Sequence, residues 1–278
     1  MPATGAVPTE VVPFDRKAIV GAALLAGAAN VIMQLARPGV GYGVIESPVE
    51  SGQLHRHPIK RARTTFSYLA VATMGTPKEK AAYRKAVNKA HAQVRSRPGS
   101  PVQYNAFDRE LQLWVAACLY RGLEDTYHAF IGPLDPAERE RFYRASAPLG
   151  TTLQVRPEDW PRDRAAFEEY WQRELKNISI DEPVRRYLRD LADLKFLPAP
   201  VSLLFGPFNR FVTTGFLPPE FREQMRLPWS ERDQRRFDRL IGALRAFIRI
   251  QPPVVRRFPF DLLIWDVRRR IRTGRPLV

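Results

Sequence analysis

The chain has 278 residues, 45% of them hydrophobic, and is therefore long and apolar enough to bury a sizeable core. Its single cysteine, Cys118, excludes an intramolecular disulfide framework, and the absence of a CxxCH motif excludes a covalently attached c-type haem. The formal net charge is +15, carried mostly by arginine. A protein of the reducing cytoplasm is the expectation from this composition.

The N-terminal segment, residues 1–14, is predicted to be flexible. Residues 18–36, AIVGAALLAGAANVIMQLA, are apolar over about 19 residues, which reaches the length needed to span a membrane. The stretch is rich in Ala and Gly, carries Asn30 and Gln34, and follows a mostly uncharged segment. These features favour a buried first helix over residues 15–36, ending at Pro38-Gly39, over a membrane span or signal anchor.

The rest of the chain shows no sustained alternation of apolar and polar residues, whereas helix start and stop signals recur throughout. The predicted fold class is therefore all-α. A Gly/Pro-rich loop is followed by a helix over residues 60–74. The next helix begins at a capping box formed by Thr76 and Glu79 and is predicted to end near residues 97–99. Further helices are expected near residues 107–132, 135–147, 163–176, 181–195, 199–216, 230–250 and 260–272.

The distribution of these helices predicts one compact bundle-like domain over residues 15–250 and a basic C-terminal extension over residues 251–278. From Arg245 onward the chain has nine arginines and two aspartates, an excess of seven positive charges. Residues 260–272 alternate this arginine block with Leu262, Leu263, Trp265 and Ile271, a pattern typical of an interfacial helix. We expect either peripheral contact with an anionic membrane or simple docking onto the helical body.

His91 lies in the stretch KAHAQVR and is one of four histidines in the chain. On a helix it shares a face with Tyr83, Val87 and Val94, so its side chain is predicted to point inward. One interpretation is a buried neutral imidazole with a hydrogen-bond partner. The other is an axial ligand that presents Nε2 to iron while a backbone carbonyl or polar side chain holds the second nitrogen.

Arg61 and Thr65 lie four residues apart in KRARTTFSYLA, followed on the same face by Tyr68 and Leu69. A guanidinium and a hydroxyl at the start of an otherwise apolar face would suit a small polar pocket for a carboxylate, or for an oxygen-derived anion and dioxygen. Alternatively, Arg61 extends to solvent and Thr65 bonds back to its own helix.

Other chemical motifs are missing from the sequence: there is no HExxH, glycine-rich phosphate loop, GxSxG or cluster of histidines and carboxylates at metal-ligand spacing. His55 and His57 precede Pro58 in a loop and are expected in solvent. His128 is expected to lie on a helix surface or in packing.

Five stretches in order resemble the MpaB-type oxygenase family, whose wider group includes the catalytic domain of the rubber oxygenase latex-clearing protein. They are AANVIMQLARPGVGYGVIESP, RARTTFSYLAVATMGT, VNKAHAQVR, YNAFDRELQLWVAACLYRGLEDTYHAFIGPLDPAERERFY and GFLPPEFRE, which together span roughly residues 20–225. The resemblance implies an all-helical fold around a b-type haem.

The same resemblance implies roles for individual residues. His91, followed by Arg95, matches the family motif H-A-x-V-R and would be the axial ligand of the haem iron, with Arg95 beside the cofactor. Arg61 and Thr65 match the distal arginine and threonine of the rubber oxygenase. Thr64 stands where the rubber oxygenase has a lysine that approaches the iron, so the rubber-cleaving reaction does not transfer directly.

The hypothesis that follows is a haem b-dependent oxygenase or oxidoreductase that acts with dioxygen on an apolar, isoprenoid- or lipid-like substrate. A haem- or lipid-binding helical protein without turnover is the alternative. The third hypothesis is a basic module bound to nucleic acid. No helix-turn-helix or other nucleic-acid-binding motif supports it, so specific nucleic-acid binding is not expected. The expected location is the cytoplasm, with membrane association as a further expectation.

Overall fold

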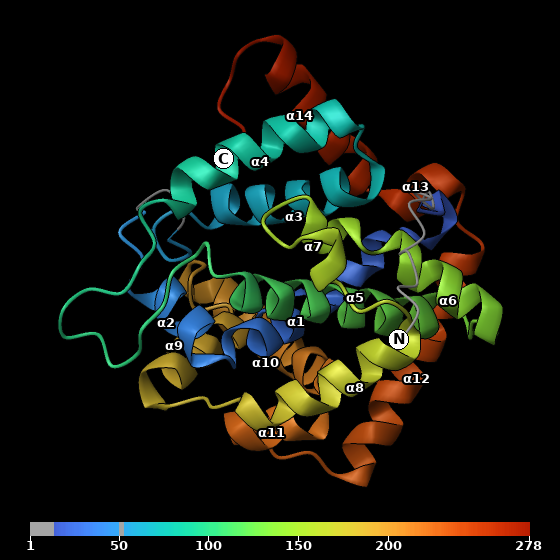
Figure 1. Ribbon diagram of the computed structural model, residues 1–278. Helices are drawn as coiled ribbons and strands as arrows, with labels where there is room; N and C mark the ends of the chain where they lie inside the picture. Colours follow the sequence, from blue (N-terminus) through green and yellow to red (C-terminus); the bar gives the residue numbers. More distant parts are fainter. Residues whose placement is uncertain (1–13, 50–52) are drawn as a thin grey trace, which may run out of the picture.

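The computed structural model describes residues 14–49 and 53–278, so residues 1–13 of the segment predicted to be flexible lie outside the described residues. Within these ranges every regular element is helical, and the predicted all-α fold is confirmed (Figure 1). Within the same ranges, Arg95 and Asn105 pair as an isolated antiparallel β-bridge. The α-helices are α1 (Gly27–Leu35), α2 (Pro38–Ile45), α3 (Pro58–Met74), α4 (Pro77–His91), α5 (Arg109–Phe130), α6 (Pro136–Ala145), α7 (Pro148–Thr151), α8 (Arg164–Glu174), α9 (Glu182–Ala192), α10 (Ala199–Phe216), α11 (Pro219–Met225), α12 (Glu231–Arg249), α13 (Pro253–Arg257) and α14 (Phe260–Arg272).

Helix starts follow the cap signals of the sequence. The Thr76 hydroxyl accepts from the Glu79 amide at 3.3 Å while the Glu79 carboxylate accepts from the Thr76 amide at 2.8 Å. Asp135 and Glu138 form the same reciprocal box at the start of α6. Each box satisfies amides that a helix N-terminus would otherwise leave unpaired, which explains why these two starts were predictable.

The N-terminal apolar stretch differs from the single helix that the sequence predicts. It forms two 3₁₀ segments, η1 (Arg16–Ala18) and η2 (Gly21–Ala26), before α1 begins. A β-carbon on Gly21 would lie 1.7 Å from the Phe258 carbonyl oxygen, so the chain passes too close to its neighbour for a larger residue. No helix among the described residues is long and apolar enough to cross a membrane.

The first helix ends just before Pro38-Gly39, as the sequence predicts, but these two residues begin α2 where the sequence predicts a loop. Pro38 occupies the first turn, where its missing amide costs nothing. The glycines that suggested a loop allow close packing: a β-carbon on Gly39 would lie 2.9 Å from Leu111 Cδ1, and one on Gly41 would lie 2.8 Å from the Leu35 carbonyl oxygen.

Helix α4 ends at His91, six residues before the expected stop near residue 97. The chain then turns back on itself, because the Ser96 amide donates to the Tyr104 carbonyl and the Ala106 amide donates to the Val94 carbonyl, both at 2.9 Å. These two bonds, together with the Arg95–Asn105 bridge, hold Val94 to Ala106 as a loop closed at its base.

The core forms around α5, which packs against α1, α7, α12 and η2. Figure 1 shows α3 and α4 side by side on one side of the α1 and α5 pair, with α8 and α11 on the other. The largest side chains in this core are fully buried aromatic residues, among them Trp114, Tyr120, Phe167 and Phe221. Burial of these rings supplies most of the apolar stabilisation of the fold.

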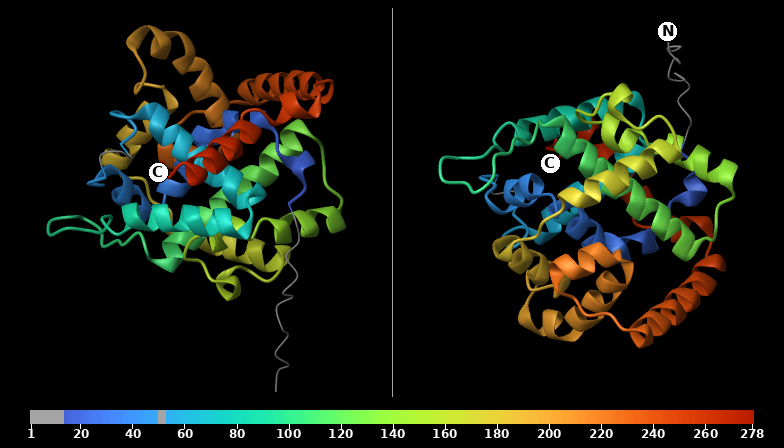
Figure 2. Two further views of the ribbon diagram at one scale, coloured as in Figure 1. Left: turned by 90° about the horizontal axis from the view of Figure 1, so that it is seen from above. Right: turned by 60° about the horizontal axis from the view of Figure 1, so that its bottom comes forward.

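The basic C-terminal segment also packs onto the body. Helix α14 lies against α3 and α4, and its residues Phe260, Ile264 and Val267 join Tyr83 and Val71 in a separate buried cluster. The left view of Figure 2 shows α14, in red near the C-terminus, lying against the body. The domain boundaries predicted at residues 14/15 and 250/251 stay predictions.

Candidate functional site

Arg61, Thr65 and His91 come from the two arms of one helical hairpin. Helices α3 and α4 are joined through Gly75 and Thr76, and Arg61 and His91 each lie fifteen residues from Thr76. The arms are held together because the Tyr83 hydroxyl donates to the Thr64 carbonyl at 2.6 Å. The hairpin therefore brings Arg61 of one arm opposite His91 of the other.

His91 is the last residue of α4 and is partly buried, with its ring edge-on to Phe107 at a centroid distance of 6.3 Å. Burial, together with the positive charge of Arg61, lowers the pKa of the imidazole from 6.5 to about 4. The ring is therefore neutral near pH 7, which is the form that ligates metals.

The Nδ1 atom of His91 is buried and has no hydrogen-bond partner among the described residues. The sequence predicted a carbonyl or polar side chain holding the second ring nitrogen, and the described part of the structure contains no such partner. A buried, unpaired imidazole nitrogen costs free energy unless a ligand satisfies it. The expected partner of the second ring nitrogen is therefore not among the described residues, and Ser67 Oγ on α3 and His128 Nε2 on α5 are buried and unpaired in the same way.

The two neighbouring threonines of α3 behave differently. The Thr64 hydroxyl donates to the Arg61 carbonyl at 3.0 Å, the ordinary local bond of a helical threonine. Thr65 is partly buried, and its hydroxyl makes no hydrogen bond within the described residues. Thr65 therefore does not bond back to its own helix and remains able to donate to a ligand.

The Arg61 side chain is exposed, but its charge affects the pKa values of largely buried groups near the hairpin. Its charge lowers the pKa of His91 and opposes the rise that burial causes in the pKa of Tyr83 and of Tyr187. Arg61, on α3, is therefore close enough to act on groups of both α4 and α9. Arg95, in contrast, is exposed in the loop after α4, and the structure gives its side chain no contact with the other predicted site residues.

Tyr187 of α9 is a site residue that the sequence did not single out. It is largely buried, its hydroxyl has no hydrogen-bond partner among the described residues, and burial raises its pKa. The His55 ring lies 5.7 Å from the Tyr187 ring and its Nε2 lies 3.9 Å from an Asp190 carboxylate oxygen. In sequence Tyr187 resembles one more apolar position of an amphipathic helix, so no local signal distinguishes it.

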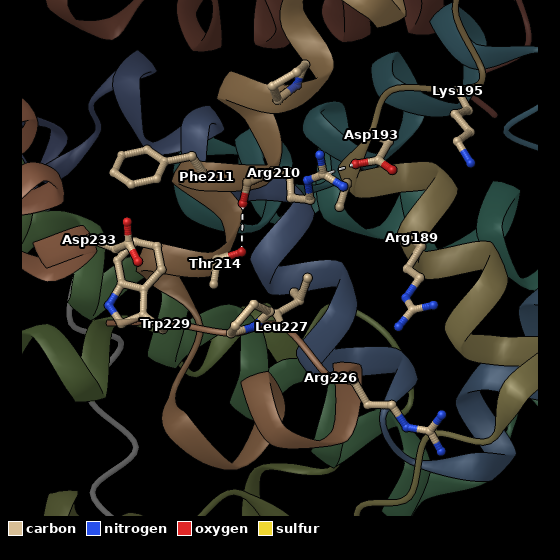
Figure 3. Close-up of a pocket in the computed structure, with 13 residues that line it drawn as sticks. Arg189, Asp193, Lys195, Arg210, Phe211, Thr214, Arg226, Leu227, Trp229 and Asp233 are labelled. Atoms are coloured by element: carbon tan, nitrogen blue, oxygen red, sulfur yellow. Dashed lines mark hydrogen bonds and ion pairs between the residues drawn. The ribbon is translucent and has the colours of Figure 1, made fainter. Parts of the chain in front are cut away.

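A separate hollow of about 580 Å³ lies between α9, α10 and the start of α12, away from these residues (Figure 3). Its walls carry the cations Arg189, Lys195, Arg210 and Arg226 beside Phe211 and Trp229. Figure 3 shows Arg210 and Asp193 pointing toward one another, and their closest charged atoms are 3.4 Å apart. None of Arg61, Thr65 and His91 lines this hollow.

Residues 18–246 match the family described as "ER-bound oxygenase mpaB/B'/Rubber oxygenase, catalytic domain". The chain belongs to this family. It is also 55% identical over 255 residues to proteins of Mycobacterium tuberculosis and Mycobacterium bovis that are described as uncharacterized, a match that covers 92% of this chain and 100% of each relative. No solved structure matches the chain.

Membership of an oxygenase catalytic family indicates an enzyme, and it confirms the resemblance that the sequence motifs suggested. Neither relative's description states a substrate or a cofactor. Among the described residues no group of three or more His, Cys, Asp or Glu side chains is placed to hold a metal ion.

Proposed function

We propose that the protein is a haem b-dependent oxygenase that acts with dioxygen on an apolar, isoprenoid- or lipid-like substrate. The observation that carries the proposal is the partly buried His91 imidazole, neutral near pH 7 and within reach of the charge of Arg61 on the other arm of the hairpin. A haem iron takes an axial ligand from a single neutral histidine, so it does not need a cluster of protein ligands.

The residues on the hairpin fit this group in distinct roles. His91 would hold the iron. Arg61 and Thr65 would face an oxygen-derived ligand, the guanidinium by charge-assisted hydrogen bonding and the hydroxyl by donation. Bound haem would supply the activation of dioxygen. Arg95, proposed as cofactor-binding through its family motif alone, lies at the exposed end of the site.

Tyr187 and Phe107 supply the apolar side of the same site. Phe107 lies edge-on to the His91 ring, and Tyr187 of α9 lies near enough to Arg61 to feel its charge. The unpaired Tyr187 hydroxyl is also a proton donor at the Arg61 side. Thr64 offers no amine where the rubber oxygenase has its lysine, and its own hydroxyl is committed to the Arg61 carbonyl. A product pattern different from rubber cleavage is therefore part of the proposal.

The test is the Soret band of protein reconstituted with haem b. We expect His91→Ala to lose the band while keeping its helical circular dichroism, because the imidazole supplies the iron bond and the surrounding apolar helices supply the fold. His128→Ala is the matched control: His128 is also partly buried with an unpaired Nε2, but it lies at the end of α5.

Full haem binding by His91→Ala, with loss in His128→Ala, would overturn the assignment. Haem bound through His91 without dioxygen consumption on any isoprenoid or lipid substrate would favour the alternative, a haem- or lipid-binding protein without turnover.

A further inference from the structure

Large apolar side chains are exposed in two regions that lie far apart in sequence. We call them together the apolar face. Its members are at least about a third exposed and come from the N-terminal half of α10 and from the segment that joins α12, α13 and α14: Val201, Leu203, Leu204, Phe205, Phe208, Phe247, Ile250, Val254, Val255 and Phe258.

The α10 part protrudes from the body and is held firmly at its base. Leu203 and Leu204 are 79% and 70% exposed, and no charged residue occurs between Lys195 and Arg210. The Ser202 hydroxyl donates to the Asp193 carbonyl at 2.9 Å, and the Asn209 amide donates to the Ala192 carbonyl at 2.8 Å. The exposure is therefore a property of a fixed helix.

The α12–α13 part is equally apolar at its tip. Ile250 and Val254 are 78% and 68% exposed on either side of Pro252-Pro253. Both α10 and α13 pack against η2, which lies between them. In the left view of Figure 2 the two regions follow the same upper edge of the molecule. They therefore form one side of the protein with two apolar tips.

Unpaired arginines border this side. Arg249 is exposed next to Ile250 and has no carboxylate partner in the described part of the chain. The Arg256 Nε atom is likewise without a hydrogen-bond partner there. Near α10, Arg189 and Arg226 line the hollow of Figure 3 and make no side-chain hydrogen bond with a described residue. The border therefore carries positive charge that no carboxylate within hydrogen-bond reach neutralises.

We propose that the apolar face docks on an anionic lipid membrane surface, with the two tips inserted among the acyl chains and the arginines at the level of the lipid phosphates. Apolar tips bordered by unpaired cations are the combination that binds peripheral proteins to anionic bilayers. A second copy of this chain fits less well, because a symmetric interface would bring two arginine borders together.

This docking differs from the interfacial helix that the sequence suggested. Leu263 of α14 packs inward with Tyr83 and Val71, and Arg268 and Arg270 are paired with Glu79 and Asp266. Leu262 and Trp265 remain exposed and lie next to the α13 tip along the chain. Helix α14 therefore contributes the border of the face, and α10 and α13 contribute the tips.

The test is co-sedimentation with vesicles of phosphatidylcholine, with and without phosphatidylglycerol. The intact chain should bind only the anionic vesicles. Leu203→Ser/Leu204→Ser and Ile250→Ser/Val254→Ser should each weaken binding about tenfold or more, because each removes two inserted apolar side chains. Arg249→Gln should weaken it a few-fold, and added salt should reproduce that loss.

Ile271→Ser is the matched control for the apolar variants, since Ile271 is 39% exposed within the arginine block of α14 but lies outside the face. Arg162→Gln, on a side chain that is 84% exposed before α8, is the control for Arg249→Gln. Neither control should change vesicle binding. Circular dichroism checks that all variants fold, and none of these measurements requires bound haem, so their outcome is independent of the proposed function.

Three results would overturn the proposal. Equal binding to neutral and anionic vesicles would remove the role of the arginines. A larger loss of vesicle binding in Ile271→Ser than in the α10 variant would assign membrane binding to α14 instead of the apolar face. A dimer in analytical ultracentrifugation that Leu203→Ser/Leu204→Ser dissociates, without vesicle binding by the intact chain, would assign the face to a second copy.

Discussion

Two clusters of buried polar groups, one around Glu124 and one around His91, differ in how far their hydrogen bonds are satisfied. Glu124 of α5 is only 1% exposed, and its carboxylate accepts from the Tyr120 hydroxyl at 2.8 Å, from Arg139 Nε at 2.7 Å and from both ends of Arg164 at 3.1 and 3.2 Å. Burial alone would raise the pKa of Glu124, but these bonds hold it at about 2. The Glu124 carboxylate is therefore hydrogen-bonded within the protein.

The polar groups around His91 have fewer hydrogen-bond partners within the protein. His91 Nδ1, the Thr65 hydroxyl and the Tyr187 hydroxyl lie on three different helices and lack hydrogen-bond partners among the described residues. Both clusters contain ionisable groups with shifted pKa values, so a shifted pKa alone does not separate them. What separates them is hydrogen bonding: the Glu124 carboxylate has several partners within the protein, whereas His91 Nδ1 is buried without one, and the Thr65 and Tyr187 hydroxyls, which are not among the buried unpaired atoms, can still bond to a ligand or to water.

The largest effect expected from this comparison is on stability. Glu124→Ala should lower the free energy of unfolding by roughly 3–5 kcal/mol, because it leaves Arg139 and Arg164 without their buried carboxylate. Denaturant unfolding measures this change. Glu231→Ala is the control: its carboxylate is 94% exposed beside Arg235, and the expected change is at most about 1 kcal/mol. Equal losses in the two variants would contradict the structural role given to Glu124.

The next effect is the pH dependence that His91 contributes in the haem-free protein. Because burial and Arg61 lower the pKa of His91 from 6.5 to about 4, the unfolded chain binds a proton in this interval and the folded chain does not. Stability is therefore full above pH 6.5 and falls toward pH 4, by no more than about 3 kcal/mol since the ring is only partly buried.

The measurement is denaturant unfolding across this interval, with His91→Leu as the comparison. Burial raises the pKa of Asp125 to about 6, which acts in the opposite direction and is present in both proteins. The difference between the two curves therefore isolates His91. An identical pH slope in the two proteins would show that the imidazole is not in the low-dielectric environment described above.

The helices that the sequence predicts best are those whose ends carry their own signal. The start of α4 at Thr76 and of α6 at Asp135 needs only local side chains, and α10 and α14 have the predicted bounds. Segments whose conformation depends on distant contacts were missed. The break at η2 depends on the Phe258 carbonyl beside Gly21, and α2 depends on neighbours that fit against its glycines.

The residues of the candidate site also fall into two classes, those with a local sequence signal and those placed by distant contacts. His91, Arg61 and Thr65 follow from a motif and a spacing, and the hairpin brings the two arms together as short connections do. Tyr187 lies beside His55 and near Arg61 only through the tertiary placement of α9, which no local pattern encodes. The early end of α4 was missed because Val94 continues the helical spacing, although the loop that it starts closes through Tyr104.

We expect a smaller effect from the threonines of α3, which differ in whether their hydroxyl bonds back to the helix. Thr65→Val should change the free energy of unfolding by less than about 0.5 kcal/mol, because the hydroxyl loses no bond to a described residue. In the haem-loaded protein the same variant should release dioxygen faster. Thr73→Val is the control: it removes a 2.7 Å bond to the Leu69 carbonyl, costs about 1 kcal/mol and leaves dioxygen release unchanged. Stopped-flow release and denaturant unfolding separate the two results.

The smallest expected effect tests whether Arg61 and His91 face each other across the hairpin. The pKa of His91 is lowered first by burial and then by the charge of Arg61, so Arg61→Gln should raise the pKa of His91, whereas Arg61→Lys should leave it nearly unchanged. The shift is small because Arg61 is exposed and water screens its charge, and high salt should reduce it further.

Nuclear magnetic resonance titration of the histidine ring protons in the haem-free protein measures this pKa directly. Arg162→Gln is the control: the Arg162 side chain is 84% exposed before α8, and its loss should leave the pKa of His91 unchanged. If Arg61→Gln leaves the titration of His91 where it was, the guanidinium lies too far from the imidazole to act on a ligand that His91 holds. Arg61 would then be a solvated surface residue, and Thr65 and Tyr187 would be the polar groups left opposite the imidazole.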